Sequence, residues 1–522
     1  MTQTSAVAPS PREEEARPGR NRAAVRDLAW PAGVAVAYTL LQLALVLPGS
    51  GLGWDETVYV SQVSPDAPAA FFSAPRARGI TYLVAPVTAL TSSVAALRVY
   101  LAVLSGAGLL LSLGVWRGLL PGRVIALAGA LFAGLWFSVF YGPAAMPNLW
   151  VAYGALIAVG CFLRAARDPS DRVALVGLGA GVALAALMRP TDAFWLVAPL
   201  AVATLWVRAW RRPALLLTLA AGAALGSAEW VVEAYLRYDG LFARLRRASE
   251  IQGHLGWNLA FDDQLRGLEG RTLCRPCDVP WRQPLTAVWW FVLPLLVAVG
   301  VLVAARARRT AVLLVPALAG LSLAVPYLLL IGYAAPRFLM PAYALLALPA
   351  AVCLTWLAGT AKPRPLVVGV LAAAMAAHLT VQYLVLETVT ARVRVARVAF
   401  GAVAAELNRQ GVRPPCIVSG EQAILVAFRA GCASRQTGGH DGSITPAEMT
   451  SAARGRPVAF LVAGSAAPPD FARGWRIHPM PGLPGRPALR AYLSPAAPAA
   501  HATPAPVASS AAAGWRNDPN SR

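Results

Sequence analysis

Residues 28–47 read LAWPAGVAVAYTLLQLALVL, an apolar run long enough to cross a bilayer as one helix. The leader before it is basic, with Arg12, Arg17, Arg20, Arg22 and Arg26. The combination is similar to a signal peptide, but the run is longer than a typical hydrophobic region and no small-residue cleavage site follows it. We therefore predict a first transmembrane helix and, in residues 1–27, a cytoplasmic leader with the composition of a disordered segment.

The whole chain is rich in apolar residues. Of its 522 residues, 57% are hydrophobic and only 14% are charged, and the mean hydropathy is +0.55. One soluble core cannot bury that many apolar side chains. The net charge of +21 is carried by arginine, with Lys362 as the single lysine. This bias toward arginine is typical of GC-rich coding, so we predict no nucleic-acid partner.

Further apolar segments of about twenty residues recur along the chain. They cover residues 97–116, 123–141, 148–165, 172–188, 192–208, 213–235, 285–305, 310–333, 338–358 and 365–388. With the first segment they predict a mainly α fold, a polytopic transmembrane bundle of about eleven helices with a cytoplasmic N-terminus.

The positions of the basic residues support this arrangement. The connections that fall on the cytoplasmic side contain Arg117 and Arg123; Arg164, Arg167 and Arg172; Arg208, Arg211 and Arg212; Arg306, Arg308 and Arg309; and Lys362 and Arg364. Basic residues concentrate on the cytoplasmic side of membrane proteins. Adding or removing one helix would place several of these clusters outside, so the order of the predicted helices is internally consistent.

Three segments are then predicted to be extracytoplasmic: residues 49–96, residues 236–284 and everything after the last helix. The first two belong to a transmembrane domain that spans residues 28–390. Each is long enough for an amphipathic helix at the membrane surface, at 57–63 and 241–251. We expect both connections to cover a cavity at the outer surface.

A small extracytoplasmic α/β domain is predicted for residues 391–494, followed by a disordered Ala/Pro/Ser-rich tail at 495–522. Its expected elements are a helix at 393–410, a strand at 416–420, a helix at 421–430 and a strand at 457–462. Its length of about a hundred residues is that of an ordinary domain. We expect Cys416 and Cys432 to form a disulfide within it.

The other cysteines are also expected to serve the structure. Cys161 and Cys353 fall in predicted helices, where a small apolar packing role is the simplest interpretation. Cys274 and Cys277 lie in the second outer connection, where an oxidising compartment favours a disulfide. A zinc site is the less favoured alternative there, because zinc needs more ligands than this pair supplies.

Ionisable residues gather at the outer ends of the predicted helices, where such residues usually face a cavity. Directly after the first helix the sequence reads Gly53-Trp54-Asp55-Glu56-Thr57-Val58-Tyr59, and Pro75-Arg76-Ala77-Arg78-Gly79 follows in the same connection. A separation of about twenty residues lets both stretches fold over one cavity, with carboxylates facing guanidinium groups.

The Trp54-Asp55-Glu56 stretch resembles the acidic motif of the GT-C superfamily of polyprenyl-phosphate-sugar-dependent glycosyltransferases, which includes protein O-mannosyltransferases and lipid A aminoarabinose transferases. Two further stretches are similar to loops of bacterial members: Pro147-Asn148-Leu149-Trp150 and Tyr333-Ala334-Ala335-Pro336-Arg337-Phe338-Leu339-Met340-Pro341. The resemblance covers the membrane region and does not require the C-terminal domain. Each motif is short, and their shared placement on the outer side carries the resemblance.

The chain departs from the better-known members at Ser73-Ala74-Pro75-Arg76-Ala77-Arg78-Gly79, which lacks their His-Pro-Pro motif. The identity of the sugar is therefore open. The paired acidic motif and the long ectodomain signature of oligosaccharyl transferases are also missing from the sequence. We predict no metal site and no cofactor, while a dependence on a divalent metal stays open.

The resemblance implies an inverting transfer of a sugar from a polyprenyl-phosphate donor to an acceptor in the cell envelope: a glycan, a lipid or a protein. Asp55 would act as the general base on an acceptor hydroxyl, with Glu56 as a second catalytic candidate. The leaving phosphate requires fixed cations, and a guanidinium group can bind it through two hydrogen bonds. The candidate phosphate-binding residues are Arg76, Arg78, Arg189 and Arg337. The candidate substrate-binding residues are Tyr59, Asn148, Glu229, Glu233, His254 and Tyr333.

Each of these residues also has a structural alternative. Asp55 and Glu56 could cap a helix at the membrane surface. Arg76 and Arg78 could contact lipid headgroups.

The same holds for the candidates that lie near later helix ends. Arg189 could form an ion pair with Asp192 across a tight turn, and Arg337 could extend toward the headgroups from a helix end. Glu229 and Glu233 share one helix face at i, i+4 spacing and could mark the membrane interface.

Two other functions compete with glycosyl transfer. A transporter or flippase predicts polar residues and broken helices near the middle of the bilayer, often in repeated halves, whereas here the charges gather at helix ends. A non-catalytic scaffold whose C-terminal domain binds cell-wall material predicts that Asp55 is dispensable. In each case the chain is a multi-pass protein of the plasma membrane that contacts membrane lipids, with the candidate site and the C-terminal domain outside.

Overall fold

The structure, a computed structural model, describes residues 16–497, with side chains from residue 27 onward. Residues 1–15 of the predicted leader and 498–522 of the predicted tail lie outside the described part. The first helix, α2 (Ala16–Leu41), begins well before the predicted start at residue 28 and continues as a π-helical turn, η1 (Gln42–Val46).

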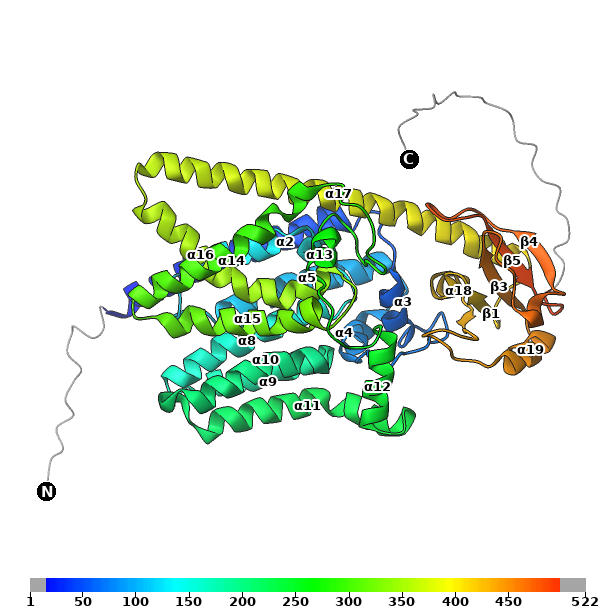
Figure 1. The fold of residues 1–522 in the computed structure, drawn as a ribbon, viewed down its shortest axis with the longest axis horizontal. Coiled ribbons are helices and arrows are strands. Elements are labelled where there is room, and N and C mark those ends of the chain that lie inside the picture. The colour runs from blue at the N-terminus through cyan, green and yellow to red at the C-terminus, as the bar shows by residue number, and fades with distance from the viewer. Residues whose placement is uncertain (1–15, 498–522) are drawn as a thin grey trace, which may run out of the picture.

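Each predicted apolar segment is helical (Figure 1). After α2 these are α5 (Val94–Gly114), α6 (Gly122–Ala133) with α7 (Trp136–Tyr141), α8 (Asn148–Arg167), α9 (Arg172–Met188), α10 (Pro190–Trp206), α11 (Pro213–Arg237), α14 (Val288–Arg306), α15 (Thr310–Leu329), α16 (Met340–Thr360) and α17 (Arg364–Arg409). Short 3-10 turns lie at η2 (Arg208–Trp210), η3 (Pro284–Ala287) and η4 (Pro336–Leu339). In the described part of the chain eight helices are long and apolar enough to cross a membrane, and α6, α9 and α10 are shorter. The predicted fold class, a mainly α membrane bundle with a small α/β domain, is confirmed.

The predicted segment 123–141 is broken between α6 and α7. Leu135 adopts an extended backbone conformation, so the helical hydrogen-bond ladder stops there. The freed N–H of Trp136 donates to Oε1 of Gln382 on α17, at 2.9 Å. A side chain of a neighbouring helix thus supplies the partner that a backbone group needs inside a membrane.

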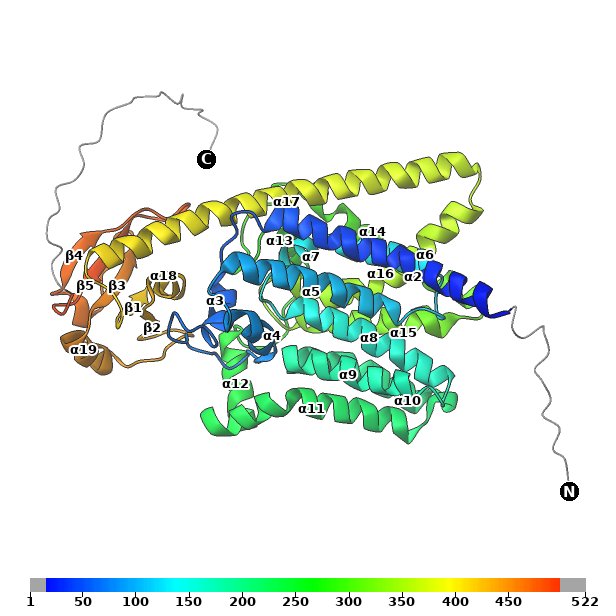
Figure 2. The same ribbon diagram turned by 180° about the vertical axis from the view of Figure 1, so that it is seen from behind.

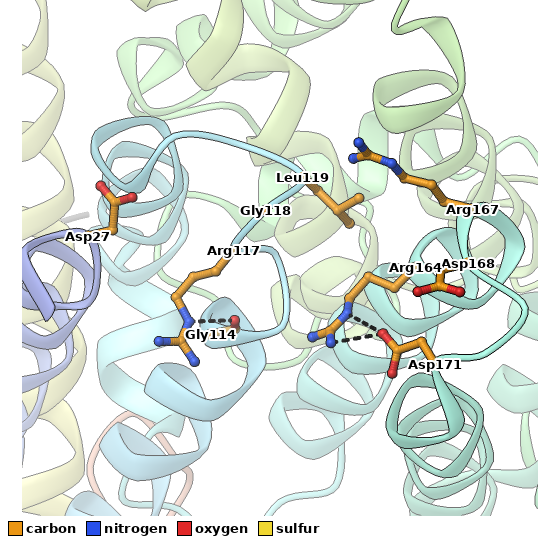
Figure 3. Close-up of a pocket in the computed structure, with 9 residues that line it drawn as sticks. All are labelled: Asp27, Gly114, Arg117, Gly118, Leu119, Arg164, Arg167, Asp168 and Asp171. Atoms are coloured by element: carbon orange, nitrogen blue, oxygen red, sulfur yellow. Dashed lines mark hydrogen bonds and ion pairs between the residues drawn. The ribbon is translucent and has the colours of Figure 1, made fainter. Parts of the chain in front are cut away.

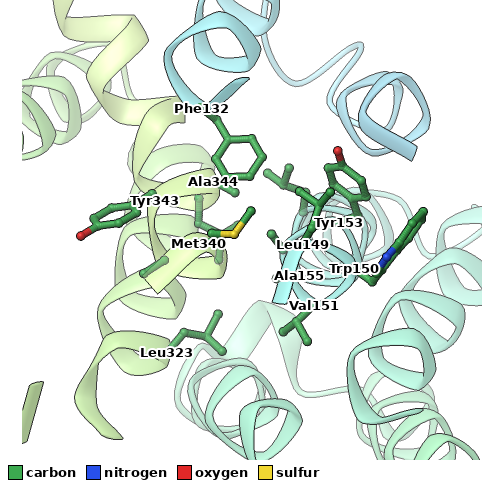
Figure 4. Packing of buried hydrophobic residues seen from close by; sticks show 14 of the residues in the cluster. Phe132, Leu149, Trp150, Val151, Tyr153, Ala155, Leu323, Met340, Tyr343 and Ala344 are labelled. Atoms are coloured by element: carbon green, nitrogen blue, oxygen red, sulfur yellow. The ribbon is translucent and has the colours of Figure 1, made fainter. Parts of the chain in front are cut away.

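Helices α8 and α16 form the centre of the bundle. In the most apolar stretch of each helix, 89% of the residues are buried for α8 and 83% for α16. Their side chains pack with Phe132 of α6 and Leu323 of α15 (Figure 4). Glycines bring α8 against α9, since a Cβ on Gly154 would lie only 2.7 Å from the carbonyl oxygen of Gly181. Small residues that allow such close approach are typical of helix packing in membranes.

Short helices gather at one end of the bundle, which we call the site end. They are α3 (Trp54–Ser61), α4 (Gly79–Thr88), α12 (Leu241–Ile251) and α13 (Phe261–Gly267) (Figure 1). Helix α12 coincides with the surface helix predicted at 241–251, and α3 overlaps the one predicted at 57–63 but begins three residues earlier. Helix α4 is not among the predicted elements. The C-terminal domain lies beyond the same end, and α2 begins at the opposite end (Figure 2).

Helix α17 runs without interruption for 46 residues. The predicted boundary between membrane region and C-terminal domain, at residue 391, therefore falls inside a helix. Neither glycine nor proline occurs between Gly369 and Gly401, so the sequence contains no residue that would end the helix there. Its last turns pack against α18 (Ala423–Ala430) of the C-terminal domain.

The C-terminal domain is built on a five-stranded sheet with the strand order β2-β1-β3-β5-β4. The strands are β1 (Ile417–Gly420), β2 (Ala433–Ser434), β3 (Val458–Ala463), β4 (Arg476–Pro479) and β5 (Leu489–Leu493). β1 is parallel to β2 and β3, and β5 is antiparallel to β3 and β4. Besides α18, the helix α19 (Pro446–Gly455) and the 3-10 turn η5 (Asp470–Ala472) belong to this domain.

Candidate functional site

A cavity of about 450 Å³ lies at the site end of the bundle. Its lining comes from α3, from the start of α8, from η4 and from the C-terminal domain. The charged residues that line it are Arg76, Arg98, Arg189, Arg275 and Arg337, with Asp55, Glu56 and Asp441. Arginines outnumber carboxylates, so the cavity has a net positive charge and suits an anionic ligand.

Asp55 lies in the first turn of α3, after Gly53, whose extended backbone opens the helix. Its Oδ1 pairs with Nη2 of Arg76 at 2.6 Å, and its Oδ2 pairs with Nη2 of Arg337 at 3.0 Å. The side chain of Asp55 is 32% exposed, against 11% for Arg76 and 9% for Arg337. Two arginines from separate segments therefore hold one carboxylate that still faces the cavity.

The two arginines keep Asp55 charged. Burial alone would raise the pKa of Asp55, but the charges of Arg76 and Arg337 hold that pKa below the ordinary value for an aspartate. The carboxylate is consequently ionised at neutral pH.

Each of these arginines is fixed by further partners. Arg337 donates to the carbonyl oxygen of Thr272 at 2.5 Å and to the hydroxyl of Tyr141 at 3.2 Å. The guanidinium of Arg76 lies 5.1 Å from the ring centre of Trp54, within range of a cation–π interaction. Guanidinium groups fixed in this way are suited to binding a phosphate.

Two more arginines line the cavity beside the Asp55 cluster. Arg189, in the turn between α9 and α10, pairs with Asp192 at 3.1 Å, so the ion pair expected as its structural alternative is present. Arg275 lies 4.7 Å from the ring centre of Tyr333. Arg275 is not among the predicted residues, although its position between two cysteines of an outer connection was a usable signal.

Glu56 has surroundings unlike those of Asp55. Its buried carboxylate pairs with Arg98 at 2.5 and 2.8 Å and accepts hydrogen bonds from the N–H groups of Gly53 and Ala145, each at 2.8 Å. Burial would raise the pKa of Glu56, but the charge of Arg98 and these hydrogen bonds lower it. These contacts tie α3 to α5 and to the loop before α8, so the carboxylate of Glu56 positions the start of α3 beside the cavity.

Arg78, Glu229 and Glu233 lie together outside the lining of the cavity. Arg78 pairs with Glu233 at 2.6 Å and with Glu229 at 3.3 Å. The fully buried Arg244 of α12 lies 2.9 Å from Glu233 and donates to the carbonyl oxygen of Arg76 at 3.0 Å. The predicted phosphate ligand Arg78 and the two glutamates thus belong to a network that positions the backbone of Arg76.

The predicted substrate-binding residues divide in the same way. Tyr59, Asn148 and Tyr333 line the cavity. Asn148 is only 1% exposed, and neither polar atom of its side chain has a hydrogen-bond partner among the described residues. A buried amide of this kind is suited to binding a ligand. His254 is exposed and does not line the cavity.

The C-terminal domain contributes His440 and Asp441 to the lining. Neither is among the predicted site residues, because no sequence pattern connects this loop to α3.

The structure joins Cys274 to Cys277 and Cys416 to Cys432. Cys161 and Cys353 are buried and free. Within residues 16–497 no group of three or more His, Cys, Asp or Glu residues is arranged to hold a metal ion.

A second cavity, of about 520 Å³, lies at the opposite end of the bundle, where α8 ends. Its charged lining residues are Arg117, Arg164 and Arg167, with Asp27, Asp168 and Asp171 (Figure 3). Arg164 pairs with Asp171 at 3.0 Å. Since arginines and aspartates balance, this cavity lacks the positive charge of the one at the site end.

No protein-family model and no curated protein matches the sequence. Among solved structures the chain is similar to ArnT from Cupriavidus metallidurans bound to undecaprenyl phosphate, with a TM-score of 0.64 and 15% identity over 89% of this chain and 98% of that one. The apo state of the same protein gives a TM-score of 0.61 and 14% identity over 89% of this chain and 97% of that one. The archaeal oligosaccharyltransferase AglB from Archaeoglobus fulgidus, in complex with an inhibitory peptide and a dolichol-phosphate, gives a TM-score of 0.44 and 14% identity over 78% of this chain and 64% of that one. This similarity is too distant to support an argument. The likeness to ArnT shows a shared fold.

Proposed function

We propose that this chain, which shares the ArnT fold, is a glycosyltransferase that moves a sugar from a polyprenyl-phosphate donor to an acceptor. The observation that carries the proposal is the carboxylate of Asp55 held between Arg76 and Arg337 in a positively charged cavity of a membrane bundle. The undecaprenyl phosphate bound to ArnT supports a lipid-linked donor.

The phosphate of the donor would bind at the arginines around Asp55. Arg76, Arg337, Arg189 and Arg275 line the cavity, and a phosphate favours two or more guanidinium groups. The bound phosphate would compete with Asp55 for the Nη groups of Arg76 and Arg337. Donor binding would thereby free an oxygen of Asp55 and raise its pKa toward the ordinary value, which makes the carboxylate a better base.

The transfer is then a single displacement. An acceptor hydroxyl oxygen forms a bond to the anomeric carbon of the sugar while the bond from that carbon to the phosphate oxygen breaks. The hydroxyl proton goes to Asp55, and the bonding electrons leave with the polyprenyl phosphate, whose charge the arginines stabilise. The displacement inverts the configuration at the anomeric carbon.

We place the cavity on the extracytoplasmic side of the plasma membrane. The basic clusters around Arg117, Arg167, Arg211 and Arg308 lie in connections at the end of the bundle away from the site (Figure 1), and the positive-inside rule assigns that end to the cytoplasm. Both disulfides belong to segments at the site end, in keeping with an oxidising compartment.

A transfer assay tests the proposed function. Membranes that contain wild type, Asp55→Asn or Asp66→Asn are incubated with radiolabelled polyprenyl-phosphate mannose, arabinose or aminoarabinose and with cell-envelope fractions. We expect Asp55→Asn to transfer label at least about a hundredfold more slowly than wild type, because it lacks the base. Asp66, an exposed residue in the same connection and outside the cavity, is the matched control and should be neutral.

Two results would count against the proposal. If wild type consumes none of the donors, the chain is not this kind of transferase. If Asp55→Asn retains full transfer, Asp55 has no part in the chemistry.

A further inference from the structure

The C-terminal domain reaches the candidate active site through one loop. Residues 436–443 lie between β2 and α19, and His440 and Asp441 of this loop line the cavity that contains Asp55. In the proposed mechanism neither side chain binds the donor phosphate or takes part in the proton transfer. Their place beside the reacting groups points to the remaining substrate, the acceptor.

The loop is fixed at its base by Gln436. Its Nε2 donates to the carbonyl oxygen of Gly420 at 2.9 Å, and its Oε1 accepts from the N–H of Gly420 at 3.1 Å. The backbone N–H of Gln436 donates to Oγ of Ser443 at 3.2 Å, and the N–H of Ser443 donates back to the Gln436 carbonyl at 2.8 Å. The two ends of the loop are therefore tied to each other and to β1, which gives His440 and Asp441 a defined position.

The domain that carries the loop is packed onto the helix that carries Asp55. Ile424 of α18 is buried in the same hydrophobic core as Leu52, just before α3, and α18 packs on α3. Arg435, directly before the loop, donates to the carbonyl oxygen of Ala69 at 3.3 Å. Contiguous packing thus fixes the distance between the loop and Asp55.

The charges in the cavity indicate which acceptor fits the loop. Burial raises the pKa of Asp441, Arg76 and His440 lower it, and Asp55 raises it further. Once the donor phosphate occupies the arginines and takes up their excess of charge, an anionic acceptor group would be repelled by Asp441 and Asp55. A cationic acceptor group would be repelled by the arginines. A neutral hydroxyl group meets neither repulsion. Asp441 and His440 are adjacent hydrogen-bonding side chains in the cavity lining, so together they match the neighbouring hydroxyl groups of a sugar, whereas a serine, a threonine or a simple lipid alcohol offers only one.

We propose that the loop 436–443 forms the acceptor subsite and that the acceptor is a glycan, whose hydroxyl groups hydrogen-bond to Asp441 and His440. This inference rests on the proposed glycosyl transfer and adds the substrate class of the acceptor. Asp441 binds the acceptor, Asp55 takes the proton of the reacting hydroxyl, and the arginines hold the donor.

Steady-state kinetics with alkyl glycosides as acceptors test the inference. The full-length protein is assayed with the polyprenyl-phosphate sugar that wild type consumes. Asp441→Asn should raise the KM for the alkyl glycoside about tenfold or more, because a hydrogen bond to a charged group is lost, and should leave the KM for the donor unchanged. Asp441→Glu should restore part of the loss. Asp470→Asn, in the same domain and 86% exposed, is the matched control and should change neither KM.

The pH dependence gives a readout that a merely structural role would not produce. Asp441 accepts the hydrogen bond as a carboxylate, and the ionisable groups that face it are those of Arg76, His440 and Asp55. The KM of wild type for the glycoside should therefore rise as the pH falls through the raised pKa of Asp441. The Asp441→Asn variant should lose this dependence.

The outcomes separate the inference from the function on which it rests. An unchanged glycoside KM in Asp441→Asn, or a raised donor KM, would contradict the acceptor subsite alone. Transfer to envelope protein or lipid while every alkyl glycoside is refused would contradict the glycan acceptor. A wild type that consumes no donor would contradict the proposed function itself.

Discussion

At the start of α3 two adjacent carboxylates have different partners. Asp55 is held by two guanidinium groups that a phosphate can take over, and its side chain stays 32% exposed. Glu56 is buried, and its hydrogen bonds go to Arg98 and to two backbone N–H groups. In the function that we propose, Asp55 therefore takes part in the chemistry, and Glu56 holds the start of α3 in place.

Removing the carboxylate of Glu56 should destabilise the protein. In Glu56→Ala the guanidinium of Arg98 stays buried without its partner, and breaking a buried pair in this way costs about 3–5 kcal/mol. The expected result is a clear fall in the thermal unfolding midpoint of the purified protein. The pair of Arg247 and Glu250 is 42% and 38% exposed, so Glu250→Ala should change the free energy of unfolding by less than about 1 kcal/mol. Equal midpoints for the two variants would contradict the positioning role of Glu56.

How much of the site the sequence predicts depends on where each residue lies. Asp55 and Arg337 stand at the outer ends of apolar segments, where the predicted topology alone brings them to one end of the bundle. Arg98 also stands at the outer end of an apolar segment, 97–116, but nothing in the sequence pairs it with Glu56, and Arg244 is one of several arginines on a short amphipathic helix. A one-dimensional pattern does not say which of these faces inward. Asp441 reaches the cavity only through the packing of a separate domain, for which the sequence contains no periodic signal.

At the level of elements, the predicted helices rest on segment length and are recovered in the structure. The interruption between α6 and α7 and the continuity of α17 are not predicted. The first depends on a side chain of a distant helix, Gln382, that satisfies the freed backbone. The second depends on the absence of glycine and proline between Gly369 and Gly401. Strands β2, β4 and β5 escape prediction because they are short or carry polar residues, and the sheet around them defines them.

The connections between these elements allow a test of the proposed orientation. Ser170 lies in the connection between α8 and α9, Ser465 lies in the C-terminal domain, and both are exposed. A membrane-impermeant maleimide should label Ser465→Cys in intact cells and Ser170→Cys only after lysis. The native free cysteines are buried, so unsubstituted protein serves as the unlabelled control. The reverse pattern would place the candidate site in the cytoplasm.

The whole molecule has a large cavity at each end of its bundle. The cavity away from the site balances its arginines with aspartates (Figure 3). The cavity at the site end carries an excess of arginines, contains Asp55 and is lined in part by the C-terminal domain. A membrane-embedded position for such a site lets a polyprenyl chain stay in lipid while its phosphate enters the cavity.

The location of a bound lipid phosphate tests the central claim most directly. Electron cryomicroscopy of the full-length protein with undecaprenyl phosphate would locate the phosphate by its density. We expect the phosphate within hydrogen-bonding distance of at least two of four guanidinium groups, those of Arg76, Arg189, Arg275 and Arg337. At least one oxygen of Asp55 should then no longer pair with Arg76 or Arg337. A phosphate bound instead beside Arg117 and Arg164 at the opposite end, with Asp55 still paired to Arg76 and Arg337, would contradict the account.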